Sequence, residues 1–110
     1  MEITQRNAEG YVALAPQGRF DMVNAPVVKA RIDALVRGGD TRIIVDLQGV
    51  SFMDSSGLGA LVGGLKTARQ AGGDVRIAHP GEQVRAVLRL TKLDRILAPF
   101  ESVEDASRGW

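Results

Sequence analysis

Hydrophobic and polar residues alternate along the first part of the chain. Residues 3–7 and 11–16 show the two-residue period of half-buried strands, and Glu9-Gly10 between them suits a hairpin turn. Apolar residues then recur every three or four positions, which predicts a helix with Asn24 as its N-cap and Gly38-Gly39-Asp40 at its end. The chain is therefore expected to begin with two antiparallel strands and a helix.

Apolar runs and helical patterns continue to alternate after residue 41. Arg42–Leu47 is rich in β-branched residues without clean alternation, as in a central strand that is covered on both faces. The pattern then predicts the following elements: a helix over about 56–71, a strand over 75–78, a helix over about 82–90, an edge strand over 96–100, and a short helix capped by Ser102. The order predicts an α/β fold with one mixed sheet of about four or five strands and helices mainly on one face, forming one domain over residues 1–110.

The stretch from Val50 to Gly59 joins the apolar strand to a helix. Asp54 and Ser55 both carry short, oxygen-bearing side chains that can accept hydrogen bonds from the free N–H groups of a first helical turn. One of them is expected to cap the helix, and the other would then lie at the surface beside the positive end of the helix dipole. Because helix N-termini stabilise anions, a phosphate there would cost the fold little. We interpret Ser55 as a switch residue.

The helix after this junction contains four glycines. These are Gly57, Gly59, Gly63 and Gly64. Each glycine in a helix interior lowers stability by about 1 kcal/mol relative to alanine. Either the helix packs closely on its own sheet, or the glycines leave a smooth surface for the backbone of another protein. The sequence leaves both explanations open.

Composition narrows the function. The 14 basic and 13 acidic residues give a formal net charge of +1, so no global field attracts nucleic acid or an anionic membrane. Cysteine is absent, which excludes disulfides, thiolate catalysis and cysteine metal sites. No segment has the apolar length of a membrane span or the pattern of a signal peptide, so we expect a cytoplasmic protein. We also expect no cofactor and no metal.

A serine hydrolase and a phospho-aspartate receiver are two other classes of protein that use a serine or an aspartate as the reacting residue. A serine hydrolase needs a Gly-x-Ser-x-Gly turn and a base, but Ser55 and Ser56 lack the preceding glycine and His79 stands alone. In a phospho-aspartate receiver Asp46 could accept the phosphate, but the strand around Val12 supplies no acidic pair. Neither class fits, and His79 is interpreted as a turn residue.

A family resemblance rests on several segments in order: Val45-Asp46-Leu47, then Phe52-Met53-Asp54-Ser55-Ser56-Gly57-Leu58-Gly59, then Gly72-Gly73. Together they resemble the STAS domains, and among these the bacterial anti-sigma-factor antagonists. Gly18-Arg19-Phe20-Asp21 is similar to the Gly-x-hydrophobic-Asp element that precedes the first helix of the family. The resemblance covers nearly the whole chain and implies the STAS fold.

The resemblance implies a cycle of partner switching rather than an enzyme. The unmodified antagonist would bind an anti-sigma factor, a serine kinase with a GHKL-type ATPase fold, and so free a sigma factor or another client. The kinase would phosphorylate Ser55, and a PP2C-type phosphatase would reverse this. Partner-binding roles are implied for Asp21, Met53, Asp54, Ser56, Gly57 and Leu58, although Asp21 could equally shape its loop and Asp54 could cap the helix.

A second interpretation within the same family needs no phosphorylation. The chain could be a non-switching STAS module that serves as a scaffold in a stress-signalling complex, or as an accessory subunit of a lipid or anion transporter. Labelling of Ser55 by a kinase would separate the two.

Overall fold

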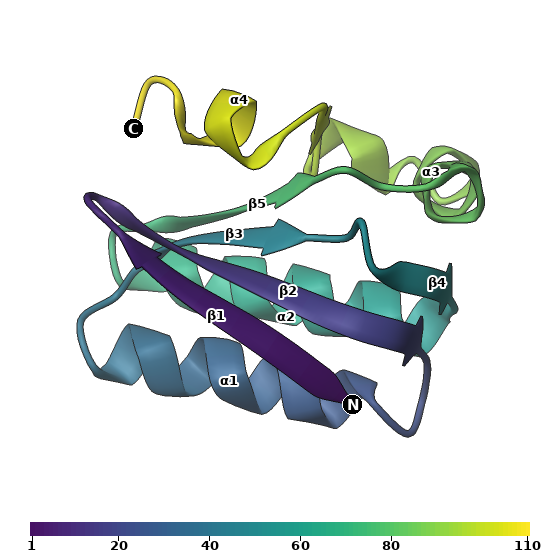
Figure 1. Cartoon of the computed structure of the whole chain (residues 1–110), viewed down its shortest axis with the longest axis horizontal. Coiled ribbons are helices and arrows are strands. Elements are labelled where there is room, and N and C mark those ends of the chain that lie inside the picture. Colours follow the sequence, from purple (N-terminus) through teal and green to yellow (C-terminus); the bar gives the residue numbers. More distant parts are fainter.

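The two N-terminal strands form the predicted hairpin in the computed structural model, which describes all 110 residues (Figure 1). β1 (Glu2–Ala8) and β2 (Tyr11–Phe20) pair antiparallel over the whole of β1. The turn between them needs Gly10, whose φ of +91° is strained for residues with a side chain. β2 runs four residues beyond the predicted end, and this extension supports the site described below.

The remaining strands form one mixed sheet with β2. β3 (Arg42–Asp46) and β5 (Asp74–Ala78) are central and parallel, and β6 (Pro99–Phe100) lies at the edge, so the order is β1-β2-β3-β5-β6. Ile43, Ile44 and Val45 are fully buried, which confirms that β3 is covered on both faces. The last strand is shorter than predicted: residues 96–98 lie outside it, after a 3₁₀ turn, η1 (Leu93–Arg95).

A sixth strand, β4 (Val50–Met53), was not predicted. After β3 the chain leaves the sheet for three residues and returns beside the second half of β2, where Arg19 and Phe20 pair in parallel with Phe52 and Met53. The register shifts between Gly18 and Arg19. β2 is therefore flanked by β3 along its first half and by β4 along its second.

Two long helices cover one face of the sheet. α1 (Ala25–Arg37) and α2 (Ser55–Gln70) lie side by side on this face (Figure 1), and α3 (Glu82–Leu90) adds Val84 and Leu88 to the same core. α4 (Val103–Ser107) packs on the opposite face, where Val103 and Ala106 cover buried residues of three strands. The prediction of helices mainly on one face is confirmed, with α4 as the exception. No helix combines the length and hydrophobicity that crossing a bilayer requires.

Close packing explains two of the four α2 glycines, Gly64 and Gly57. A Cβ at Gly64 would lie 2.8 Å from Cδ1 of Ile32, which is fully buried on α1. One at Gly63 would lie 2.8 Å from Lys29 Cε, the flexible end of a side chain that can move aside. A Cβ at Gly57 would overlap the carbonyl oxygen of Phe20 at the end of β2. Gly59 alone faces open space, so only this glycine fits the second explanation, a surface left smooth for another protein.

Candidate functional site

Asp54, not Ser55, caps α2. Its Oδ1 accepts hydrogen bonds from the backbone N–H of Ser56 at 2.9 Å and of Gly57 at 3.1 Å, and its carbonyl oxygen accepts one from Leu58 N–H at 3.1 Å. Ser55 is the first helical residue and is exposed, and its hydroxyl makes no hydrogen bond within the chain. The capping chemistry left two alternatives open, and the geometry assigns the cap to Asp54 and leaves the Ser55 hydroxyl free.

Neighbouring elements hold the turn before Ser55. The backbone N–H of Asp54 donates to the Phe20 carbonyl at 3.4 Å. On the other side of the turn, the side-chain amide of Gln83 makes two 2.8 Å hydrogen bonds with Met53: Oε1 accepts from Met53 N–H and Nε2 donates to Met53 C=O. Gln83 was not identified from the sequence, because a glutamine in the first turn of a helix carries no signal of a partner 30 residues away.

Three of the six expected partner-binding residues are buried. Met53 is 0% exposed and Leu58 is 4% exposed, both within the core cluster, and Gly57 is packed under the end of β2. In the unbound chain these three residues are therefore not accessible to a partner, and direct contact by them stays a prediction. They lie beneath the surface because β4 and the first turn of α2 close the core at this end, and they support the exposed Ser55 from below.

Asp21 shapes the loop between β2 and α1. Its Oδ1 accepts hydrogen bonds from the backbone N–H of Val23 at 3.1 Å and of Asn24 at 3.2 Å, and its Oδ2 lies 3.6 Å from Arg19 Nε. Asn24 occupies the predicted cap position, but its side chain donates to the Arg19 carbonyl at 2.8 Å instead of capping α1. α1 has no side-chain cap, and the Asp21 backbone carbonyl accepts the N–H of Ala25, the first helical residue. The Asp21 carboxylate is engaged within the loop that precedes the helix.

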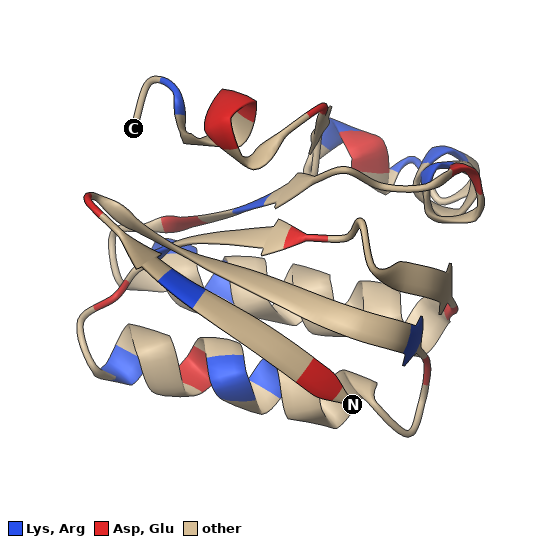
Figure 2. Ribbon diagram, viewed as in Figure 1, with Lys and Arg blue, Asp and Glu red and all other residues tan.

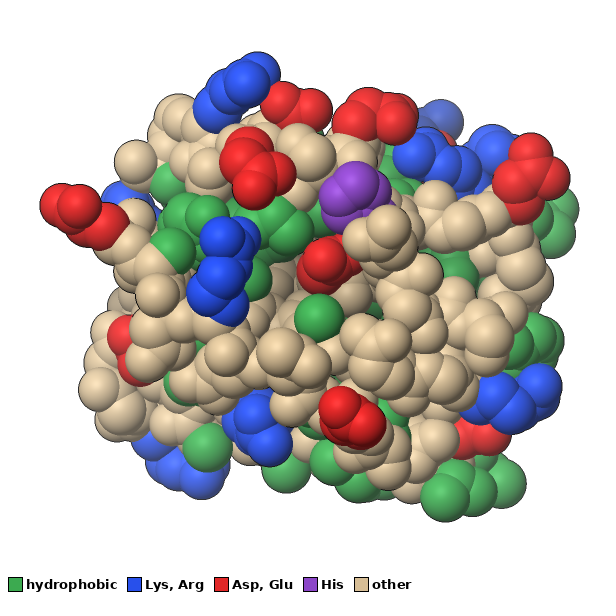
Figure 3. All heavy atoms as spheres, viewed as in Figure 1, with side chains coloured by type: hydrophobic (Ala, Val, Ile, Leu, Met, Phe, Trp, Pro, Cys, Tyr) green, Lys and Arg blue, Asp and Glu red, His purple; other side chains and the backbone are tan.

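A groove lies beside Ser55, between the N-terminal halves of α1 and α2. It has a volume of about 400 Å³, and its lining residues are Met22, Ala25, Pro26, Lys29, Ser56, Gly59 and Ala60. Met22 and Val23 in the adjoining loop are 72% and 75% exposed, and Figure 3 shows hydrophobic side chains at the lower right, over this loop. Sequence reasoning missed this surface, although two consecutive apolar residues between Asp21 and Asn24 were a visible signal.

Few charges surround the exposed serine. The first eleven residues of α2 carry none, as the tan ribbon in Figure 2 illustrates. The nearest cation lining the groove, Lys29, is held by Asp33 with Nζ 2.7 Å from both carboxylate oxygens. The site is thus an uncharged helix start next to the Asp54 carboxylate.

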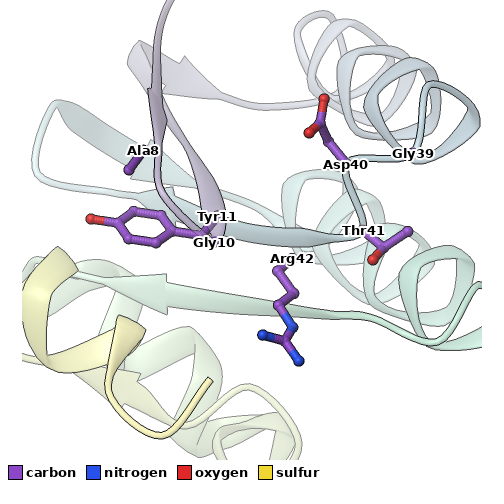
Figure 4. Close-up of a pocket in the computed structure, with 7 residues that line it drawn as sticks. All are labelled: Ala8, Gly10, Tyr11, Gly39, Asp40, Thr41 and Arg42. Carbon is purple, nitrogen blue, oxygen red and sulfur yellow. The ribbon is translucent and has the colours of Figure 1, made fainter.

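The other candidate features, a second pocket and His79, lie away from Ser55 and do not form a site with it. A polar pocket of about 240 Å³ lies where β2 and β3 begin, at the opposite end of the sheet from Ser55, and Figure 4 shows its Arg42 guanidinium and Asp40 carboxylate pointing apart. His79 is half-buried with a φ of +53°, and its backbone N–H donates to the Phe100 carbonyl. It turns the chain between β5 and α3, in agreement with its interpretation as a turn residue. No group of three or more acidic or histidine side chains is placed to hold a metal ion.

Comparisons with known proteins agree with this geometry. The anti-sigma-B factor antagonist of Bacillus subtilis is 35% identical over 81 residues, which cover 73% of this chain and 72% of the relative. The crystal structure of a Thermotoga maritima protein provisionally named an anti-sigma factor antagonist superposes with a TM-score of 0.88 at 30% identity, covering 94% of this chain and 90% of that chain.

SpoIIAA, an anti-sigma factor antagonist of Bacillus, has been solved in both states. At 23% identity its unphosphorylated form has a TM-score of 0.81, covering 96% of this chain and 92% of that chain, and its phosphorylated form has a TM-score of 0.73, covering 96% of both. This likeness concerns the fold. The model of the STAS domain family matches residues 2–106, nearly the entire sequence. The chain therefore belongs to the STAS domain family.

Proposed function

We propose that this protein is an anti-sigma factor antagonist whose binding is switched by phosphorylation of Ser55. In the unmodified state it binds an anti-sigma factor that is a serine kinase of the GHKL type, and a sigma factor or other client is released. The kinase transfers the γ-phosphoryl group of ATP to Ser55 Oγ, the hydroxyl proton is lost and ADP leaves. A PP2C-type phosphatase restores the hydroxyl by hydrolysis. Since the exchange uses ATP and controls transcription, we place it in the cytoplasm.

The observation that carries the proposal is the free hydroxyl of Ser55. It is exposed at the first position of a helix, it makes no hydrogen bond, and the cap is supplied by its neighbour Asp54. A kinase can therefore modify Ser55 without breaking any interaction that holds α2. The role of the relatives named above supports the anti-sigma factor as the partner.

The charge balance favours a change in binding over a change in folding. A phosphate adds about −1.5 to −2 charge at pH 7. Three N–H groups at the start of α2 are already engaged by Asp54, and Lys29, the cation that lines the groove, is paired with Asp33. The phosphate would stay hydrated beside the Asp54 carboxylate. A partner packed here would meet its bulk and an uncompensated charge, which costs several kcal/mol at a buried interface.

The groove beside Ser55 supplies the contact surface in this proposal. Met22, which lines the groove, and Val23 in the adjoining loop are exposed apolar residues of the kind that anchors protein interfaces, and Gly59 leaves room for a close approach. Ser56 lines the same groove, one residue from the modified hydroxyl. Asp21 contributes by holding the loop that carries Met22 and Val23.

The direct test is labelling by the cognate anti-sigma-factor kinase with ATP, followed by intact-mass spectrometry. The wild type is expected to gain one phosphate, Ser55→Ala none, and Ser56→Ala one, since the neighbouring serine is a matched control on the same turn. A wild type that gains no phosphate, or a Ser55→Ala variant that is labelled equally, would favour the alternative of a scaffold or transporter-accessory STAS module.

A further inference from the structure

Resting on the proposed function, we infer that Gln83 is a positioning residue for the switch: its side-chain amide holds the backbone of Met53 and so fixes where the Ser55 hydroxyl is presented.

Gln83 fills a gap in the sheet. β4 pairs with β2 along one edge only. Its other edge has no strand, because β5 ends at Ala78 and the chain then turns through His79 into α3. The Gln83 amide supplies there one donor and one acceptor with the geometry of a peptide group, and both hydrogen bonds to Met53 measure 2.8 Å. The side chain therefore acts as a one-residue substitute for a neighbouring strand.

This contact lies directly behind the switch. Met53 is fully buried, so without Gln83 its N–H and C=O would be left without protein partners away from bulk water. The residue after Met53 is the cap of α2, and Ser55 follows it. On its second side the turn is held by the 3.4 Å hydrogen bond from Asp54 N–H to Phe20, which is longer than either Gln83 bond. Loss of the Gln83 amide would remove the two shorter hydrogen bonds and leave the turn before Ser55 held by the longer one.

The exact position of the Ser55 hydroxyl matters more to the rate of phosphoryl transfer than to the stability of the fold. A hydroxyl displaced by about 1 Å from its reactive geometry can lose as much as 100-fold in rate. Because α2 remains capped by Asp54 and packed on α1, such a displacement would leave the fold in place. Gln83 does not touch the phosphate donor in this account; it acts through the Met53 backbone.

The experiment measures single-turnover phosphorylation of the full chain by the cognate kinase at saturating ATP. Gln83→Leu keeps the size of the side chain and removes both hydrogen bonds. Val87→Ala is the matched control, because it trims a half-buried residue of the same helix that packs on the core and whose side chain cannot hydrogen-bond to Met53. We expect the transfer rate of Gln83→Leu to fall about tenfold or more relative to Val87→Ala at equal thermal stability.

Amide hydrogen exchange gives a second readout that a general loss of stability would not reproduce. Faster exchange is expected at Met53 and Asp54 in Gln83→Leu and not in Val87→Ala. If the wild type is labelled at Ser55 and the two variants react equally fast, the positioning role is overturned while the proposed function stands. If the wild type is never labelled at Ser55, the proposed function fails and the positioning role fails with it.

Discussion

Replacing Gly57 with alanine adds one methyl group at a point where the start of α2 touches the end of β2. The new Cβ would overlap the Phe20 carbonyl oxygen, and it would lie 2.9 Å from Met53 Cγ and 3.0 Å from Phe20 Cγ. Phe20 and Met53 are both fully buried, so neither side chain can swing into solvent. The carbonyl cannot retreat freely, because it also accepts the hydrogen bond from Asp54.

The cost can be worked from these contacts. Overpacking of this kind costs about 1–3 kcal/mol, and the backbone overlap places Gly57→Ala at the upper end. Alanine recovers about 1 kcal/mol of helix propensity, so the free energy of unfolding should fall by about 2 kcal/mol. Gly59→Ala is the matched control: it lies on the same helix with open space around it, and should raise the free energy of unfolding by about 0.5–1 kcal/mol.

Urea denaturation followed by circular dichroism measures the free energy of unfolding of both variants, and thermal unfolding gives their melting temperatures. With about 4 °C per kcal/mol for a chain of this size, melting temperatures should move by about −8 °C and by about +2 to +4 °C. Opposite signs from two glycines two residues apart would reflect packing rather than propensity. If both variants shift the same way, the close approach of α2 to β2 is not what fixes Gly57.

Three further outcomes follow from the site and from the C-terminus. Asp54→Ala removes the cap and should cost about 1 kcal/mol, whereas Ser55→Ala should leave the melting temperature within about 2 °C; equal losses would contradict the assignment of the cap. Met22→Ser should weaken binding of the anti-sigma factor about tenfold without loss of stability, because Met22 is 72% exposed, while Leu90→Ser on the exposed end of α3 should bind normally; equal affinities would exclude the groove. Arg76→Ala removes hydrogen bonds to the carbonyls of Ala106 and Arg108 and the contact 4.1 Å from the Trp110 ring, so the fluorescence of this single tryptophan should shift to the red; an unchanged spectrum would show that Arg76 does not hold the C-terminus.

Local chemistry made the serine predictable from sequence. Caps depend on a few neighbouring residues, so the pattern around Asp54 and Ser55 located a helix start and a surface hydroxyl. The pattern could not decide between the two, because both side chains accept hydrogen bonds from a first turn. The decision depends on how Met53 and Phe20 hold the chain, and these contacts join residues far apart in sequence.

Non-local pairing explains what was missed. β4 is only four residues long with a polar residue inside it, and it exists because the second half of β2 offers an open edge. Met53 looks like a candidate interface residue in the sequence, but this pairing carries it into the core. The groove beside Ser55 depends on how α1 and α2 lie against each other, which no local pattern specifies. Gly59 could be told apart from the other glycines only once this packing was known.

The affinity of the anti-sigma factor for the chain before and after modification of Ser55 tests the central claim most directly. Isothermal titration calorimetry with unmodified and stoichiometrically phosphorylated protein should show a loss of at least about 100-fold, equivalent to about 2.7 kcal/mol. The melting temperatures of the two forms should stay within about 2 °C, since Asp54 keeps the cap in both. Equal affinities, or a phosphorylated form that has unfolded, would contradict a switch that acts on binding alone.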